Sequence, residues 1–349
     1  MIHGFKLALA ALALSAAVAA PARAQQTANS LVPLPERRGA EQTLLTYPEW
    51  FLVHSPAEYA RTVQSGVPQD FPFLRHIGQL WSSYAAVTAE QWRDGYPANP
   101  GYHLMINVLS ASTTVEYTLR SAYENTVGRL SWALSGSRPS AEDRYAAMAA
   151  QDYVDFIRQE PWYRYDFTAR LKHLWTDVPA TGPGMLRKWE RRYALTTEYA
   201  VKAVYGKLIA WATGVIYTPA RMTTAVVVDH LPPAWSPPAR VSILAREADG
   251  RAVLSLPRYF DFRIAATALA EDGIHITDIA GNTSEVLVTL WLARGAPFDP
   301  SMGRVLFEQS LSVPANQRRV AVLMPVGKLS AALLAAKQRG WQVEHVYDD

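Results

Sequence analysis

The sequence contains no cysteine among its 349 residues. This absence excludes a disulfide framework, a thiolate metal site, an iron–sulfur cluster and a cysteine nucleophile. The glycine-rich patterns that bind nucleotide phosphates are also missing, and so is the Gly-x-Ser-x-Gly elbow of many hydrolases. We therefore predict no cofactor and no resident metal.

An excess of charge of either sign is missing as well. The 34 basic and 31 acidic residues give a net charge of +3, and without Lys6 and Arg23 of the first 24 residues it falls to +1. Such a balance gives no electrostatic argument for nucleic acid as a partner. Hydrophobic residues make up 49% and charged residues 19%, which excludes disorder of the whole chain. A chain of this length usually divides into two hydrophobic cores.

Residues 1–24 have the pattern of a secretory signal peptide. A basic start is followed by an apolar run from Leu7 to Ala20 and by small residues just before Gln25. This pattern predicts export with cleavage before Gln25, and the run is shorter than the ~20 residues that a membrane-spanning helix needs. The alternative is an uncleaved N-terminal anchor. In both cases the folded part leaves the cytoplasm, and we expect it in the periplasm.

The mature chain is predicted to start with a flexible leader over 25–45 and to continue as an all-α domain over 46–218. Two capping boxes, at Thr46 and at Ser55, predict two short helices that begin there. Apolar residues then recur at helical spacing in four longer segments. These segments are 71–92, 103–134, 140–160 and 185–217.

The residue pattern changes after a proline-rich segment. Four prolines lie between Asp229 and Arg240, and beyond them hydrophobic residues alternate with period two. We predict a linker over 219–239 and an α+β domain over 240–349. Its element order, two strands, a helix and a strand, occurs twice. This order predicts a ferredoxin-like antiparallel sheet with two helices on one face, so the expected fold class is α+β with two domains.

The segment 103–134 carries an uncharged polar stripe and is otherwise apolar, which predicts a largely buried helix. Buried amides and hydroxyls need hydrogen-bond partners. The stripe is therefore either a network that ties helices together or the wall of a polar cavity. Its members are His103, Asn107, Ser110, Thr114, Tyr117, Ser121 and Asn125. Of these, Asn107, Ser110, Thr114 and Tyr117 are the candidate binding residues.

A local similarity links two of the predicted helices. The segment 114–123 (TVEYTLRSAY) resembles 196–205 (TTEYAVKAVY). In each, a glutamate precedes a cation by four residues, Glu116 before Arg120 and Glu198 before Lys202, which is the favourable order for a pair along a helix. The match is compatible with chance or with an internal duplication. The charges lie either on two solvated helix faces or between paired helices that hold buried ion pairs.

Three histidines of the helical half are the candidates for catalysis. They are His54, His76 and His103, with Glu116 as a carboxylate partner. No two of them have the i, i+3 or i, i+4 spacing of metal-binding helices, so we predict cap, corner or surface roles for them and no metal site.

The segment 185–217 begins with a basic cluster that includes two aromatic residues. Cations beside interfacial aromatics, followed by an apolar stripe, are typical of a helix that lies on an anionic membrane. Lys202 and Lys207 interrupt the apolar stretch, so it does not read as a span. The alternative is a core helix with a solvated basic end. The cluster consists of Arg187, Lys188, Trp189, Arg191, Arg192 and Tyr193.

These patterns together predict an exported envelope protein that binds or scaffolds without catalysis. We expect its partner to be an envelope protein or a small ligand, with peripheral contact to an anionic membrane surface as a further expectation. The alternative is a periplasmic enzyme with a polar cavity beside His103, in which His54 or His76 acts as acid or base and Glu116 as partner.

The first testable prediction concerns processing. If the small-residue site is used, the exported protein begins at Gln25, because signal peptidase cleaves after small residues. Intact-mass spectrometry of the periplasmic fraction measures this directly. An exported chain that retains residues 1–24 would contradict cleavage and support the anchor.

Overall fold

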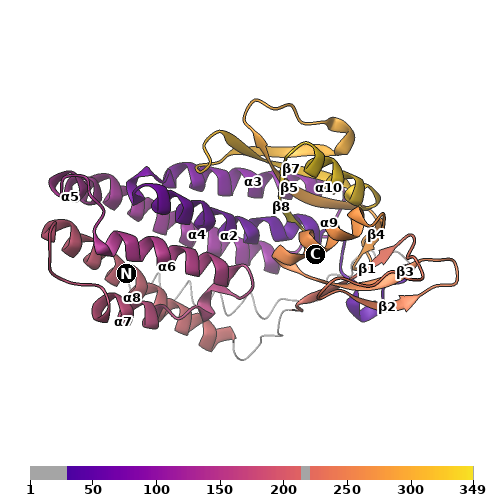
Figure 1. Ribbon diagram of the computed structural model, residues 1–349, viewed down its shortest axis with the longest axis horizontal. Coiled ribbons are helices and arrows are strands. Elements are labelled where there is room, and N and C mark those ends of the chain that lie inside the picture. Colours follow the sequence, from indigo (N-terminus) through magenta and orange to yellow (C-terminus); the bar gives the residue numbers. More distant parts are fainter. Residues whose placement is uncertain (1–29, 214–220, 349) are drawn as a thin grey trace. The chain divides into compact units, whose positions relative to one another are not determined.

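The fold is described from a computed structural model of the chain, which covers residues 30–213 and 221–348 (Figure 1). It is mixed α+β: helices dominate up to residue 213, and two antiparallel four-stranded sheets follow. The expected signal peptide at 1–24 lies outside the described residues. The described chain clusters into two compact units. The first contains 50–81 and 101–213, and the second contains 30–49, 82–100 and 221–348.

Seven α-helices are described before residue 213, with short turns between them. The helices are α2 (Gln42–Ser65), α3 (Phe73–Arg93), α4 (Pro100–Tyr123), α5 (Arg129–Leu134), α6 (Ala141–Ile157), α7 (Phe167–Thr176) and α8 (Met185–Thr213). The turns are η1 (Leu34–Glu36), η2 (Pro68–Asp70), the π-helical η3 (Glu124–Gly128) and η4 (Trp162–Arg164).

The four long helical segments expected from the sequence are present, except that residues 214–217 of the last one lie outside the described residues. Helix α6 starts as the sequence suggests, because Ser140 Oγ accepts from the Asp143 amide at 3.1 Å and Asp143 Oδ2 accepts from the Ser140 amide at 2.9 Å. Helix α7 was not predicted, because the aromatic residues that precede it suggested a turn between helices. Asp166 caps it by accepting from the Ala169 amide at 2.8 Å.

The two capping boxes at Thr46 and Ser55 are wrong. Both residues lie inside the continuous helix α2, where the Thr46 hydroxyl donates to the Gln42 carbonyl at 2.9 Å instead of capping. Pro48 and Pro56 also lie within α2. Proline removes a helical hydrogen bond, and burial of the apolar side chains of α2 outweighs this loss.

The first unit, which we call the helical unit, contains an internal repeat. Trp81 Nε1 donates to Thr114 Oγ1 at 3.0 Å, and Trp175 Nε1 donates to Thr196 Oγ1 at 3.1 Å. The tryptophans are 94 residues apart and the threonines 82. The same contact therefore joins α3 to α4 and α7 to α8.

Other contacts recur at the same two offsets. The Arg120 guanidinium lies over Tyr59 and Phe73, and Lys202 Nζ lies over Tyr153 and Phe167. His76 pairs with Glu58, and Arg170 pairs with Asp152. These correspondences support an internal duplication, in which α6, α7 and α8 repeat α2, α3 and α4.

The second unit, which we call the α+β unit, also consists of two similar modules. The first has β1 (Thr223–Val228), β2 (Ser242–Arg246), β3 (Ala252–Pro257), α9 (Phe262–Glu271) and β4 (Ile276–Ile279). The second has β5 (Glu285–Ala293), β6 (Arg304–Ser310), β7 (Gln317–Pro325), α10 (Leu329–Gln338) and β8 (Gln342–Val346). Their sheets have the equivalent orders β2-β3-β1-β4 and β6-β7-β5-β8, and all neighbouring strands are antiparallel.

The structure thus has two sheets with one helix each, where the sequence suggested one sheet with two helices. The difference arises from β1, which lies within the segment 219–239 that was expected to be a linker. With β1 included, each module has four strands and forms a sheet of its own. The prolines between β1 and β2 therefore lie in a loop inside one sheet.

The end of the expected leader is also ordered against this unit. Leu31 and Val32 pack on Ala225, Val227 and Val253 of the first sheet. The Ser30 hydroxyl donates to Asp278 Oδ2 at 2.5 Å. This part of the expected leader therefore belongs to the fold, because Leu31 and Val32 cover apolar side chains of the sheet.

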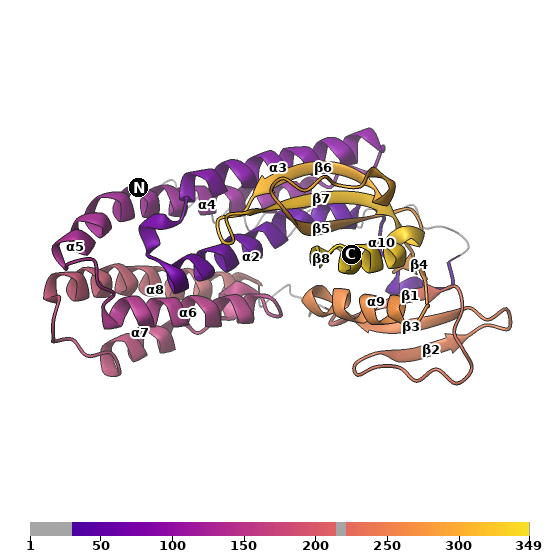
Figure 2. The same ribbon diagram turned by 45° about the horizontal axis from the view of Figure 1, so that its top comes forward.

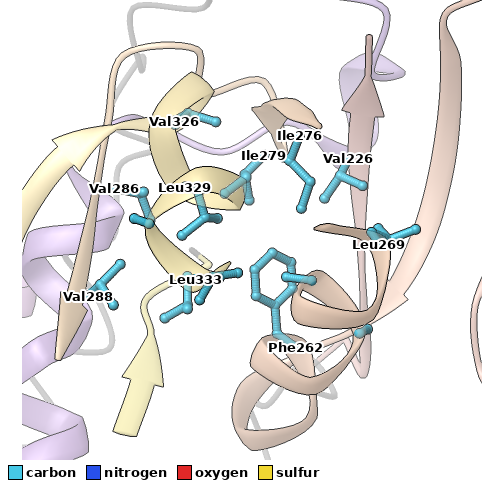
Figure 3. Close-up of a cluster of buried hydrophobic side chains, with 14 of the residues drawn as sticks. Val226, Phe262, Leu269, Ile276, Ile279, Val286, Val288, Val326, Leu329 and Leu333 are labelled. Carbon is cyan, nitrogen blue, oxygen red and sulfur yellow. The ribbon is translucent and has the colours of Figure 1, made fainter. Parts of the chain in front are cut away.

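One hydrophobic core holds both modules together. Helices α9 and α10 lie between the two sheets (Figure 2). Phe262 of α9 lies close to Leu329 and Leu333 of α10, and Leu269 of α9 belongs to the same core (Figure 3). Two hydrogen bonds at equivalent positions join the modules. The Ile276 amide donates to Ser330 Oγ at 3.1 Å, and Arg263 Nη1 donates to the Val343 carbonyl at 2.6 Å.

Candidate functional site

Only some residues of the polar stripe lie on the buried face of α4. Ser110 and Tyr117 are buried, Thr114 is half-buried, and Asn107 is exposed, with its amide donating to the His103 carbonyl of the same helix at 2.7 Å. The expectation that this helix is largely buried is wrong. Its apolar residues lie mainly on the outside, because its polar residues take the inner positions.

A buried polar cluster joins α2, α3 and α4 beneath this stripe. Ser55 Oγ lies 2.9 Å from Nδ1 of His76 and 2.7 Å from the Tyr117 hydroxyl, and His76 Nε2 lies 3.6 Å from a Glu58 carboxylate oxygen. Burial raises the pKa of Tyr117 to about 12, although the hydrogen bond from Ser55 acts in the opposite direction. All four side chains are buried among aromatic rings. The cluster therefore ties three helices together.

The three candidate histidines lie in different surroundings. His76 belongs to this cluster, His54 packs beside Trp50, and His103 is half-buried, with its pKa lowered by desolvation. Within the described residues, no group of three or more His, Asp or Glu side chains is arranged to hold a metal ion.

Glu116 belongs to a network of four charges between α4 and α8. Arg120 lies 3.4 Å from both Glu116 and Glu198, and Lys202 lies 3.1 Å from Glu116 and 2.7 Å from Glu198. Because Glu116 pairs with Lys202 and Arg120 with Glu198, the two helices run antiparallel. The sequence left two alternatives for the charges of 114–123 and 196–205, solvated helix faces or ion pairs between paired helices. The structure has the ion pairs between paired helices, and the charges are half-buried.

The carboxylate of Glu198 is strongly stabilised in this network. Burial acts to raise its pKa, but the charges of Arg120 and Lys202 outweigh burial and lower the pKa from 4.5 to about 2. Glu198 therefore stays ionised, and its negative charge offsets the two cations that it contacts.

The basic cluster of α8 lies inside the helical unit. Arg187 and Arg192 are 0% and 1% exposed, and Lys188 and Arg191 are also buried. The cluster is thus not a surface patch, and none of its four cations is placed to attract anionic lipid. Trp189 and Tyr193, on the other side of the helix, are exposed.

Each buried cation is neutralised by a carboxylate from a neighbouring segment. Arg187 contacts Asp143 at 2.7 Å and 3.1 Å, and Arg191 forms a two-pronged pair with Glu124 at 2.9 Å and 3.0 Å. Glu142 accepts from both Lys188, at 3.1 Å, and Arg192, at 2.8 Å. Bidentate arginine–carboxylate pairs, in which two N–H groups donate to the two carboxylate oxygens, are among the strongest hydrogen-bonded contacts in proteins.

The pKa of Arg191 shows how these pairs compensate for burial. Desolvation acts to lower it, but hydrogen bonds and charge from Glu190 and Glu124 raise it above the ordinary value. Glu124 is the first residue of the π-helical turn η3, and the carbonyl of its last residue, Gly128, accepts from Arg187 at 3.0 Å. The widened turn thus supplies two partners for the basic cluster.

The apolar residues of α4, α5 and α8 lie on the side opposite this interior. Tyr117 and Tyr199 point into two aromatic clusters, so residues half a turn away point outward on the same side of the antiparallel pair. We call this side the outer face. Its large exposed members are Leu104, Met105, Val115, Leu119, Val127, Leu130, Leu134, Leu186, Trp189, Tyr193, Val201, Val204 and Trp211.

The outer face is almost free of charge. Among the exposed residues of 100–134, Arg129 is the only charged one, and among those of 185–211 it is Lys207. Val115, Leu119, Val201 and Val204, near its centre, are 60%, 66%, 61% and 71% exposed. Exposed apolar side chains that gather on one side of a helix pair are typical of sites of protein or membrane interaction.

Sequence reasoning missed the outer face because it assigned the apolar side of each helix to the interior. A usable signal was present in α8, where cations recur at i, i+1, i+4 and i+5 on one side of the helix and Leu186, Trp189 and Tyr193 recur at i, i+3 and i+7 on the other. Periodicity separates the two sides of a helix but does not state which one is buried.

Comparisons with known proteins add no further assignment. No family model, curated protein or solved structure matches the chain significantly.

The buried network yields a prediction about stability. Within the described structure, Glu142 is the carboxylate that pairs with both Lys188 and Arg192, and Glu142→Gln removes its charge. We expect a loss of roughly 3–5 kcal/mol in the free energy of unfolding, because breaking a buried pair leaves uncompensated charge. Urea denaturation measures it. The matched control is Glu160→Gln at the exposed pair with Arg164, for which about 0–1 kcal/mol is expected. Equal effects of both variants would contradict a buried network.

The network of four charges yields a prediction about acid stability. Since the pKa of Glu198 falls from 4.5 to about 2 on folding, its contribution to stability is complete above pH 4.5 and is lost as the pH falls toward 2. The free energy of unfolding should therefore decrease across this window. In Glu198→Gln the decrease should be smaller, as urea titrations at successive pH values would show. An unchanged slope would mean that Glu198 is not stabilised by the cations.

Proposed function

We propose that the protein is a non-catalytic binding or scaffolding protein of the cell envelope, and that it lies on a lipid bilayer through the outer face. The observation that carries this proposal is the nearly charge-free apolar surface formed by α4, α5 and α8. The membrane contact expected from the sequence is kept, but its cause changes. Hydrophobic burial replaces attraction between the basic cluster and anionic lipid, because that cluster is buried.

Three features favour lipid over a protein partner. The outer face offers almost no charges for pairing with a protein rim, whereas acyl chains require none. It extends along α8, whose 29 residues correspond to roughly 40 Å of helix. Trp189, Tyr193 and Trp211 are exposed on α8, and tryptophan and tyrosine are the residues preferred at membrane interfaces.

The sequence outside the described residues is consistent with this location. The run Leu7–Ala20 would direct the chain to the membrane, either as a cleaved signal or as an anchor. As for the described helices, none combines the length and the apolar composition needed to cross a bilayer.

A periplasmic enzyme remains the second candidate. Ser55, His76 and Glu58 are the residue types of a hydrolytic triad, and Ser55 lies within hydrogen-bonding distance of the imidazole. However, Ser55 is 1% exposed and His76 is 0% exposed, so a substrate could meet the hydroxyl only after the helices separate. A structural role explains the cluster without such a movement.

We also propose that the helical part and the α+β part act as two domains, with each α+β module related to the ferredoxin-like type. The common feature is the split β-α-β unit, in which β3 and β4 flank β1 and are joined through α9. Under this proposal a protease cut in the loop between β1 and β2 opens a sheet and does not separate the domains.

Vesicle sedimentation of the exported chain tests the membrane proposal. We expect binding to neutral phosphatidylcholine vesicles that persists at about 0.5 M NaCl, because burial of apolar surface is not screened by salt. The double variant Leu119→Lys/Val201→Lys should bind at least roughly tenfold more weakly, since each buried apolar side chain contributes about 1.5–3 kcal/mol.

The matched control places the same two charges elsewhere. Leu74 of α3 and Ile264 of α9 are 61% and 55% exposed, and Leu74→Lys/Ile264→Lys should leave vesicle binding unchanged. Binding restricted to anionic vesicles, or equal loss in both double variants, would contradict the proposal. If vesicles are not bound and Leu119→Lys/Val201→Lys turns a dimer into a monomer, the outer face binds a second copy of the chain and the proposal is wrong.

A further inference from the structure

A groove of about 680 Å³ opens on another part of the helical unit. Its walls come from the end of α2, the turn η2, α5 and α6, and η2 packs against the π-helical turn η3. A volume of this size is typical of small-ligand sites. π-helical turns are rare and frequently occur at functional sites.

One residue that lines this groove carries a buried hydrogen-bond acceptor without a donor. Gln69 lines it and is 9% exposed, and within the described residues no donor reaches its Oε1 atom. A buried acceptor without a partner destabilises the fold, because it loses its hydrogen bond to water and gains none in return. Because this oxygen has no partner to give up among the described residues, the Gln69 amide can turn toward the groove, where a ligand hydroxyl or amide would supply the missing donor.

An aromatic platform lines the same groove. Trp132 forms part of the wall, and the Arg187 guanidinium lies 5.4 Å from the centre of its indole ring. Arg187 is held in turn by Asp143, another lining residue. The buried basic cluster therefore fixes the position of the indole, which is the preorganisation that a binding site needs.

The polar lining is balanced in charge and rich in planar groups. Asp70 and Asp143 are matched by Arg129 and Arg144, and Gln64 adds a further amide to that of Gln69. A lining without net charge gives no preference for an ionic ligand. It suits a neutral ligand with many hydroxyls, each of which both donates and accepts, and with an apolar face that packs on an indole.

We propose that this groove is a binding site for a neutral oligosaccharide. The sugar ring stacks on Trp132, a hydroxyl or acetamido group donates to Gln69 Oε1, and the carboxylates and guanidinium groups of the rim bind the remaining hydroxyls. The site is independent of the outer face, so the failure of either proposal leaves the other standing.

Isothermal titration calorimetry with cellotriose and with triacetylchitotriose tests the site on the full exported chain. We expect at least one of them to bind and Gln69→Leu to weaken that binding by roughly tenfold or more, since one well-made hydrogen bond is lost. The melting temperature of Gln69→Leu should stay the same or rise, because the variant removes an unpaired acceptor. Its binding to vesicles should not change.

The matched control is Gln159→Leu, at an exposed glutamine of the same unit outside the groove, which should leave sugar binding unchanged. Absence of binding to both trisaccharides would overturn the proposal. So would equal affinity in Gln69→Leu and the natural chain. If triglycine binds, is lost in Gln69→Leu, and neither sugar binds, the groove takes a peptide and the assignment to oligosaccharides is wrong.

Discussion

The helical unit depends on the neutralisation of buried cations. Four cationic side chains of α8 point inward, and each needs a carboxylate, because an unpaired charge in the interior costs several kcal/mol. Glu124, Glu142, Asp143 and Glu190 supply these carboxylates. Their positions restrict the start of α6, the π-helical turn η3 and the first half of α8. The indole of Trp132, and with it one wall of the groove, is held by the same contacts.

This arrangement reverses the usual distribution of residues in α4 and α8. Polar and charged side chains pair in the interior, and aliphatic side chains such as Leu119 and Val201 lie outside. The paired charges are tolerated in the interior because each one is matched, and the aromatic clusters around Tyr117 and Tyr199 supply the hydrophobic contact between the helices. The exposed aliphatic side chains then gain stability only from something that covers them. In this sense the fold and its proposed contact with lipid have one cause.

Much of the secondary structure could be predicted because it depends on local patterns. The long helices lie where their apolar spacing predicted them, and strands dominate the part of the chain where hydrophobic residues alternate with period two. β1 was missed because flanking prolines suggested a linker, and its central place in a sheet depends on β3 and β4, which are remote in sequence. The basic cluster of α8 was found but placed outside. Burial of Arg187 depends on Asp143, a partner 44 residues away that periodicity cannot reveal. Gln69 had no sequence signal, since its unpaired state exists only in the folded chain.

The internal repeat also sets the symmetry of the outer face. Leu119 of the first half corresponds to Val201 of the second, and the antiparallel course of α4 and α8 relates the halves by an approximate two-fold axis that passes between Arg120 and Lys202 and emerges at the centre of this face. A partner that binds across the centre meets nearly the same surface after a half-turn. Such a surface does not distinguish between two orientations of a partner that differ by a half-turn in its plane. It therefore suits a partner that has no direction in that plane, and a fluid sheet of lipid is one.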